Sequence, residues 1–215
     1  MMEFTTWDIL RNLLLAARWT VLLSIVAFIG GGLLGMVILF LRTAKSKAAQ
    51  RFAWGYIELF QGTPLLMQLF LVFFGLSLVG LNVPPWLAAG TALIIWTSAF
   101  LSEIWRGCVE AIAKGQWEAS ASLGMGYLQQ MRWVILPQAF KIVLPPYGNI
   151  MIMMLKDSSQ ASTITVAELA LQGKLIASST FKNTSVFTLV ALMYLTMSIP
   201  LILLVRHFEK KANRK

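Results

Sequence analysis

Long stretches of this sequence contain no charged residue, and this feature constrains the fold more than any other. Neither an acid nor a lysine or arginine occurs within residues 19–41, 59–102 or 183–205. A helix needs about 20 apolar residues to cross the hydrocarbon core of a bilayer. Only 13% of the 215 residues are charged, whereas soluble domains carry about 25%. The composition therefore indicates a membrane protein.

The apolar runs predict an all-α membrane protein with five transmembrane helices in a single domain, residues 1–215. The run 59–102 is too long for one span, and Asn82-Val83-Pro84-Pro85 divides it into two helices joined by a tight turn. No cleavable signal peptide is expected, because the first residues lack a basic-then-apolar pattern and a small-residue cleavage site. The predicted spans are residues 19–41, 57–80, 84–103, 134–155 and 184–206.

The distribution of basic residues predicts the orientation of these spans. With the N-terminus outside and the C-terminus in the cytoplasm, the inner segments contain 13 of the 18 basic residues: Arg42, Lys45, Lys47, Arg51, Arg106, Lys114, Arg132, Lys141, Arg206, Lys210, Lys211, Arg214 and Lys215. The outer segments contain the other five: Arg11, Arg18, Lys156, Lys174 and Lys182. Cytoplasmic loops carry an excess of Lys and Arg, so this orientation is favoured.

The first span contains the glycine-rich segment 30–35. Gly31 and Gly35 have the small-xxx-small spacing that permits close contact between helices. This contact could form within one subunit or between two subunits.

A short polar segment, residues 115–131, lies between the third and fourth spans and is expected in the cytoplasm. Its pattern predicts a short helix with Trp117, Ala121 and Leu128 on one side. Gly124 is expected to end this helix in a left-handed conformation, and a second helix starts soon after it. Such a helix, lying along the membrane face, suits the docking of a soluble partner.

The composition also excludes several classes of protein. The net charge of +9 does not indicate nucleic-acid binding, because the basic residues lie at the ends of apolar runs. One cysteine, Cys108, rules out an intramolecular disulfide. With a single histidine, His207, a dedicated metal site is not expected. A membrane enzyme is disfavoured, since the acidic residues are scattered at span ends and do not converge.

The polar segment and its surroundings resemble a known family. Glu118-Ala119-x-x-x-Leu123-Gly124, followed by Ile135-Leu136-Pro137-Gln138-Ala139, resembles the EAA loop of bacterial ABC-importer permeases. Three further segments make the chain similar to the polar amino acid permeases: Glu58-Leu59-Phe60-Gln61-Gly62-Thr63-Pro64-Leu65-Leu66, Ser98-Ala99-Phe100-Leu101-Ser102-Glu103-Ile104-Trp105-Arg106-Gly107 and Lys156-Asp157-Ser158-Ser159.

The resemblance implies a function. Such permeases sit in the bacterial inner (plasma) membrane, pair as homo- or heterodimers and dock cytoplasmic ABC ATPases through the EAA loop, which acts as a coupling helix. A periplasmic or tethered binding protein delivers the amino acid. ATP and Mg²⁺ belong to the ATPase, so no cofactor is expected in this chain, and it contains no Walker motif. The residues that the resemblance assigns to ATPase coupling are Gln116, Glu118, Ala119, Leu123 and Gly124.

Substrate contacts are expected where polar groups interrupt the apolar spans, because a polar substrate needs compensating groups in the membrane. Pro64 removes a backbone donor and frees an upstream carbonyl, and Thr63 adds a hydroxyl. Ser98 shares a helix face with Ser102. On these grounds and on the resemblance, the predicted substrate-binding residues are Gly62, Thr63, Ser98 and Asp157.

Each of these side chains also has a structural alternative. The Thr63 hydroxyl could bond a carbonyl of its own helix, and the two serines could be packing residues. Asp157 could cap the following segment or pair with Lys156. Glu103 and Arg106, three residues apart, are expected to pair in a structural or gating role, whereas the role of Gln68 stays open.

The sequence departs from the family pattern at two positions: Gln61 replaces the usual Arg, and Gln160 the usual Leu. These differences leave open whether this subunit binds substrate itself or supports a different subunit in a heterodimer. The alternative function is an ATP-independent channel or secondary carrier for a small polar solute. It is disfavoured because the central spans lack charges and no repeat is evident.

Overall fold

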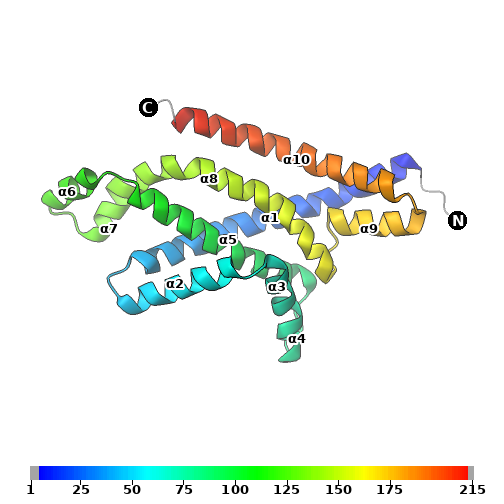
Figure 1. The fold of residues 1–215 in the computed structure, drawn as a ribbon, viewed down its shortest axis with the longest axis horizontal. Helices are drawn as coiled ribbons and strands as arrows, with labels where there is room; N and C mark the ends of the chain where they lie inside the picture. Colours follow the sequence, from blue (N-terminus) through cyan, green and yellow to red (C-terminus); the bar gives the residue numbers. More distant parts are fainter. Residues whose placement is uncertain (1–4, 213–215) are drawn as a thin grey trace.

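The structure is a computed structural model that describes residues 5–212 (Figure 1). No strand occurs among these residues, which confirms the all-α class. The elements in chain order are α1 (Thr6–Thr43), α2 (Lys47–Gly62), α3 (Leu65–Phe70), the π-helical turn η1 (Leu71–Gly75), α4 (Leu76–Leu78), α5 (Pro85–Glu110), α6 (Lys114–Ser122), α7 (Tyr127–Gln130), the π-helical turn η2 (Met131–Ile135), α8 (Leu136–Asp157), the 3-10 helix η3 (Ser158–Ile164), α9 (Leu169–Thr180) and α10 (Asn183–Ala212).

Within the described residues, three helices are long and apolar enough to cross a membrane: α1, α5 and α10. Helix α2 and the α3–α4 segment pass the same test only as a pair, and the angle between them is 105°. If this pair forms one broken span, the number rises to four. Residues 57–80 are therefore not one straight helix, because the chain bends sharply after Gly62. Helix α8 covers most of residues 134–155 and contains Pro145 and Pro146.

The long helices pack along one another and separate the two chain ends (Figure 1). The C-terminal end of α10 lies towards the end of the bundle that carries α6 and α7. The N-terminal end of α1 lies at the opposite end, beside α9. The α3–α4 segment points away from the bundle axis, as the bend requires.

Helix α1 begins well before the predicted span at residue 19. Its start is fixed by a capping box, in which the Thr5 hydroxyl accepts from the Asp8 amide while the Asp8 carboxylate accepts from the Thr5 amide. With 38 residues and a rise of 1.5 Å per residue, α1 is about 57 Å long. It therefore extends beyond a hydrocarbon core of about 30 Å.

Two glycines of α1 form its contact with α5. A Cβ atom added to Gly31 would lie 2.6 Å from the Thr97 Cβ, and one added to Gly35 would lie 3.0 Å from the Ser98 carbonyl oxygen. The two backbones approach more closely than any larger residue would allow. The small-xxx-small motif therefore serves packing within one subunit, which was one of the two alternatives.

The predicted break at Asn82-Val83-Pro84-Pro85 is confirmed. Helix α4 ends at Leu78, and Gly80 has a positive φ of 84° that turns the chain. Pro85 then occupies the first position of α5, where its missing N–H has no cost.

Candidate functional site

The chain bends sharply between α2 and α3, at the segment Gly62-Thr63-Pro64. Thr63 and Pro64 are both extended, with ψ of 139° and 136°, so the helix cannot continue through them. A proline disfavours the helical conformation at the residue before it. This confirms the predicted interruption at the start of the second apolar run.

The polar groups at this bend are bonded to one another. The Gln68 side-chain Nε2 donates to the Phe60 carbonyl at 2.9 Å, to the Thr63 carbonyl at 3.1 Å and to the Thr63 hydroxyl at 2.9 Å. The Thr63 hydroxyl in turn donates to the Leu59 carbonyl at 2.8 Å. The hydroxyl therefore bonds within its own helix, as the structural alternative predicted.

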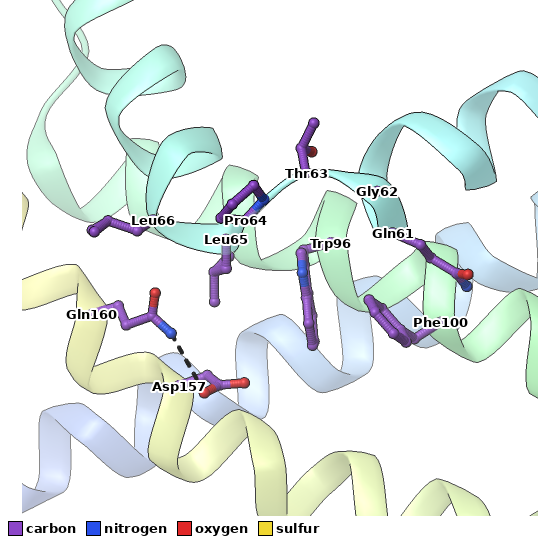
Figure 2. Close-up of a pocket in the computed structure, with 10 residues that line it drawn as sticks. All are labelled: Gln61, Gly62, Thr63, Pro64, Leu65, Leu66, Trp96, Phe100, Asp157 and Gln160. Carbon is purple, nitrogen blue, oxygen red and sulfur yellow. Dashed lines mark hydrogen bonds between the residues drawn. The ribbon is translucent and has the colours of Figure 1, made fainter.

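A cavity of about 480 Å³ lies beside this bend (Figure 2). Its walls come from three parts of the chain: the bend itself, the middle of α5 and the junction of α8 with η3. The lining residues are Gln61, Gly62, Thr63, Pro64, Leu65, Leu66, Trp96, Phe100, Asp157 and Gln160. The structure thus brings Gly62, Thr63 and Asp157 together, although they come from distant parts of the sequence.

Asp157 is the ionisable residue of the cavity lining. It is half-buried at the end of α8, and its carboxylate accepts a long hydrogen bond of 3.5 Å from the Gln160 amide (Figure 2). Among residues 5–212 it forms no ion pair with Lys156 or any other cation, and it makes no side-chain cap for η3. The carboxylate therefore retains hydrogen-bonding capacity on the cavity side.

The opposite wall is aromatic. The rings of Trp96 and Phe100 lie one helical turn apart on α5, with centroids 4.2 Å apart and an interplanar angle of 35°. Beside them, the Gln61 amide donates to the Ala99 carbonyl at 3.1 Å. Sequence reasoning missed Trp96 as a site residue. Its spacing of four residues from Phe100, in the segment that contains Ser98, was the signal that could have identified it.

Ser98 does not line the cavity. It is fully buried between α5 and α2, where its hydroxyl lies 2.7 Å from the Tyr56 hydroxyl and donates to the Ile95 carbonyl at 2.7 Å. Ser102 likewise donates to the Ala99 carbonyl at 2.8 Å. Both serines act as packing residues here, because Gly31 and Gly35 of α1 press against the same turns of α5.

An ion-pair cluster occupies the end of α5. Arg106 Nε donates to Glu103 at 2.7 Å, and another nitrogen of the guanidinium bonds Glu110 at 2.5 Å. This confirms the predicted pairing of Glu103 with Arg106, and it adds Glu110 as a partner that the spacing of four residues allows.

Helix α6 lies at one end of the bundle (Figure 1). It ends as predicted, since Gly124 has a φ of 74°. The residues assigned to ATPase coupling, Gln116, Glu118, Ala119, Leu123 and Gly124, are all exposed. On the inner side of α6, Ser120 is buried, and Gln116 accepts a hydrogen bond of 3.0 Å from Gln138 of α8.

The predicted common face of Trp117, Ala121 and Leu128 is wrong. The left-handed turn at Gly124 changes the chain direction, so Leu128 belongs to α7 and is 71% exposed. Trp117 instead stacks on Tyr127, with ring centroids 6.4 Å apart and an interplanar angle of 17°. The stack holds α6 against the helix that leads into α8.

The fold and these features define a helical membrane transport subunit. Residues 31–214 match the family model described as the binding-protein-dependent transport system inner membrane component. The chain therefore belongs to this family of ABC-importer permeases. It is a transport subunit of the bacterial inner membrane and not an enzyme, and ATP hydrolysis belongs to a partner ATPase.

Curated relatives cover nearly the whole chain. It is 38% identical over 195 residues to the probable glutamine ABC transporter permease protein GlnM of Bacillus subtilis, covering 91% of this chain and 90% of the relative. It is 34% identical over 207 residues to the glutamine transport system permease protein GlnP of Escherichia coli K12, covering 95% of this chain and 94% of the relative.

Solved structures agree with the fold. The crystal structure of an amino acid ABC transporter with histidines has a TM-score of 0.89 and 35% identity, covering 98% of this chain and 100% of that one. The methionine transporter MetNI in an inward-facing conformation has a TM-score of 0.72 at 18% identity, covering 97% and 99%, which shows similarity of fold alone.

Proposed function

We propose that this subunit moves a polar amino acid across the inner membrane by alternating access, and that the cavity beside the α2–α3 bend is its substrate site. The observation that supports this most is the half-buried Asp157 carboxylate, which faces aromatic rings and lies beside a bend in an otherwise apolar chain. Ionisable groups within membrane proteins commonly mark substrate pathways.

The chemistry of the cavity suits a zwitterion. The Asp157 carboxylate can pair with an α-ammonium group, which the face of Trp96 can also attract. The side-chain amides of Gln61 and Gln160 can donate to the α-carboxylate. Gly62 and Thr63 contribute the shape of the wall, since the Thr63 hydroxyl is already engaged within the bend.

We further infer five spans, with the N-terminus outside and the C-terminus in the cytoplasm. The spans correspond to α1, the broken pair of α2 with α3–α4, α5, α8 and α10. The excess of basic residues in the predicted inner segments supports this orientation. It puts α6 on the cytoplasmic side, where residues 115–131 act as the coupling segment.

The assembly is proposed from the family and from the surface of α6. Two permease subunits, identical or different, form the pathway, and each docks one ATPase on the exposed residues Gln116, Glu118, Ala119, Leu123 and Gly124. A binding protein delivers the amino acid from outside. ATPase closure then moves α6 and, through it, α8, which ends at Asp157.

The names of the relatives guide the choice of substrate. Relatives are named for glutamine, nopaline and L-cystine. Polar amino acids are thus the class to test, beginning with glutamine.

The test is uptake by the complete transporter in proteoliposomes, with its ATPase and binding protein. Hydrogen bonds to a charged group contribute about 1.5–3 kcal/mol, and about 1.4 kcal/mol is tenfold in affinity. Asp157→Asn should therefore raise the substrate concentration for half-maximal uptake at least about tenfold, while ATPase binding stays normal. Glu58→Gln, which neutralises an exposed carboxylate of α2, is the control.

Unchanged half-saturation in Asp157→Asn would remove this cavity as the substrate site. Uptake that proceeds down a gradient without ATP would instead support the ATP-independent channel or carrier.

A further inference from the structure

Gln68 is a buried polar residue on the apolar helix α3, and its position at the bend suggests a specific role. We propose that Gln68 is a positioning residue that locks the angle between α2 and α3, and that it sets substrate affinity without touching the substrate. This inference rests on the proposed function of the cavity.

The bend leaves the Phe60 carbonyl without its helical donor, and Gln68 supplies another donor. In a continuous helix the amide of residue 64 would donate to the Phe60 carbonyl, but residue 64 is a proline and has no N–H. The Gln68 amide donates to that carbonyl at 2.9 Å in its place. The carbonyl that Pro64 frees is therefore occupied by the protein itself, and it is not open to a substrate.

The same amide group also holds the residue at the corner. Its two N–H bonds serve three acceptors, because Nε2 also lies within hydrogen-bond distance of the Thr63 carbonyl, at 3.1 Å, and the Thr63 hydroxyl, at 2.9 Å. Gln68 thus connects the last turn of α2, the corner and α3. Only 6% of the residue is exposed, so water does not compete strongly for these bonds.

The orientation of the Gln68 amide is set by these acceptors. Its oxygen Oε1 is buried without a hydrogen-bond partner in the described structure, which costs about 1–3 kcal/mol. Exchanging the nitrogen and oxygen would place an acceptor against two carbonyl oxygens. The donors of Gln68 are therefore the part that the bend requires.

The bend in turn shapes the cavity. Thr63, Pro64, Leu65 and Leu66 form its wall on this side, and Gln68 follows within the next turn of α3. When the link to the Phe60 carbonyl is lost, the α3–α4 segment can rotate about the extended residues 63–64. The wall then moves relative to Asp157 on the facing helix, which lowers substrate affinity.

Two substitutions test this in the complete transporter. Gln68→Met preserves length and apolar volume but removes both donors, and Gln68→Glu replaces the donor nitrogen with an acceptor. We expect the half-saturation concentration to rise at least about fivefold in both variants, with ATPase binding and maximal uptake changed less than twofold. Gln50→Met is the matched control on α2, since Gln50 bonds only the Ala44 carbonyl, far from the bend.

A distance measurement reports the bend independently of transport. Spin labels replace the exposed residues Phe52 of α2 and Leu78 of α4, in a Cys108→Ala background that removes the single native cysteine. The distance distribution should be narrow with Gln68 present and clearly broader in Gln68→Met. An unchanged distribution would overturn the proposal.

The outcomes also separate this proposal from the proposed function. Impaired affinity in Asp157→Asn with normal affinity in Gln68→Met would overturn the role of Gln68 alone. Normal affinity in both variants, despite a broadened distribution, would overturn both the substrate site and this role. Combining Gln68→Met with Thr63→Val should have no greater effect than either change alone, because the two side chains act as one unit; multiplicative effects would contradict that.

Discussion

The Tyr194 hydroxyl of α10 donates a hydrogen bond of 2.9 Å to the carboxylate of Glu168, which is completely buried. Thr20 of α1 donates to the same carboxylate at 3.2 Å, and the Leu171 amide of α9 donates to its other oxygen at 2.9 Å. This single carboxylate therefore joins α1, α9 and α10. Buried charged groups are tolerated where hydrogen bonds satisfy them.

Tyr194→Phe should destabilise the protein by about 1–3 kcal/mol, because it removes a donor and leaves the buried Glu168 oxygen less satisfied. The measurement is thermal unfolding followed by intrinsic tryptophan fluorescence. Thr196→Val on the same helix is the control, since its exposed hydroxyl bonds only the Leu192 carbonyl. Equal midpoints for Tyr194→Phe and wild type would contradict the role of this network.

Gly31→Ala should destabilise the packing of α1 on α5 by about 1–3 kcal/mol, the usual cost of an overfilled contact. The added methyl group would lie 2.6 Å from the Thr97 Cβ. Gly32→Ala is the matched control, because its methyl group would lie 3.7 Å from the nearest atom, the Tyr147 hydroxyl oxygen. Thermal unfolding of both variants checks this prediction. Similar unfolding midpoints for the two variants would argue against a close contact between α1 and α5 at Gly31.

Gly124→Val should reduce uptake strongly while the protein still inserts in the membrane. A β-branched residue at φ of 74° is strained, and the left-handed conformation costs about 1–2 kcal/mol, so the end of α6 must change shape. Gly126→Val serves as the control because its φ is −69°. Co-purification of the ATPase and uptake are measured together; normal uptake in Gly124→Val would count against α6 as the coupling helix.

Gln138→Met should lower the number of amino acids transported per ATP hydrolysed, by about two- to fivefold, which corresponds to a hydrogen bond of about 0.5–1 kcal/mol. It removes the bonds to Gln116 and to the Val134 carbonyl but substitutes none of the residues proposed to dock the ATPase. ATPase activity and uptake are measured on the same vesicles. If the ratio is unchanged, the link between α6 and α8 does not depend on this bond.

Much of the architecture was predictable because membrane helices follow simple rules of length and charge. The break at Pro84-Pro85, the end of α6 at Gly124 and the pairing of Glu103 with Arg106 each follow from local chemistry. The extent of the bend at Thr63-Pro64 was harder to foresee. Proline predicts an interruption, but the angle depends on Gln68 and on the packing of α3 against α5.

The cavity was only partly predictable for a similar reason. Gly62, Thr63 and Asp157 could be proposed as site residues from their residue types. Trp96 lines the cavity only because helices distant in the sequence pack together. Ser98 was misplaced because spacing defines a helix face and does not reveal which neighbour covers it. Tyr56 of α2 covers that face.

The glycine contacts of α1 with α5 also limit how the transporter can change shape. At Gly31 and Gly35 the α1 backbone lies directly against Thr97 and Ser98 of α5. Helix α1 therefore cannot shift along α5 by one turn without steric overlap of side chains. We therefore expect α1 and α5 to travel as one rigid body. The end of α8 belongs to the same body, because the Ser24 hydroxyl of α1 donates to the Ser158 hydroxyl at 3.3 Å and the Thr97 hydroxyl of α5 donates to the Met154 sulfur at 2.7 Å. Each transport cycle would in that case leave the gap between Trp96 and Asp157 nearly constant.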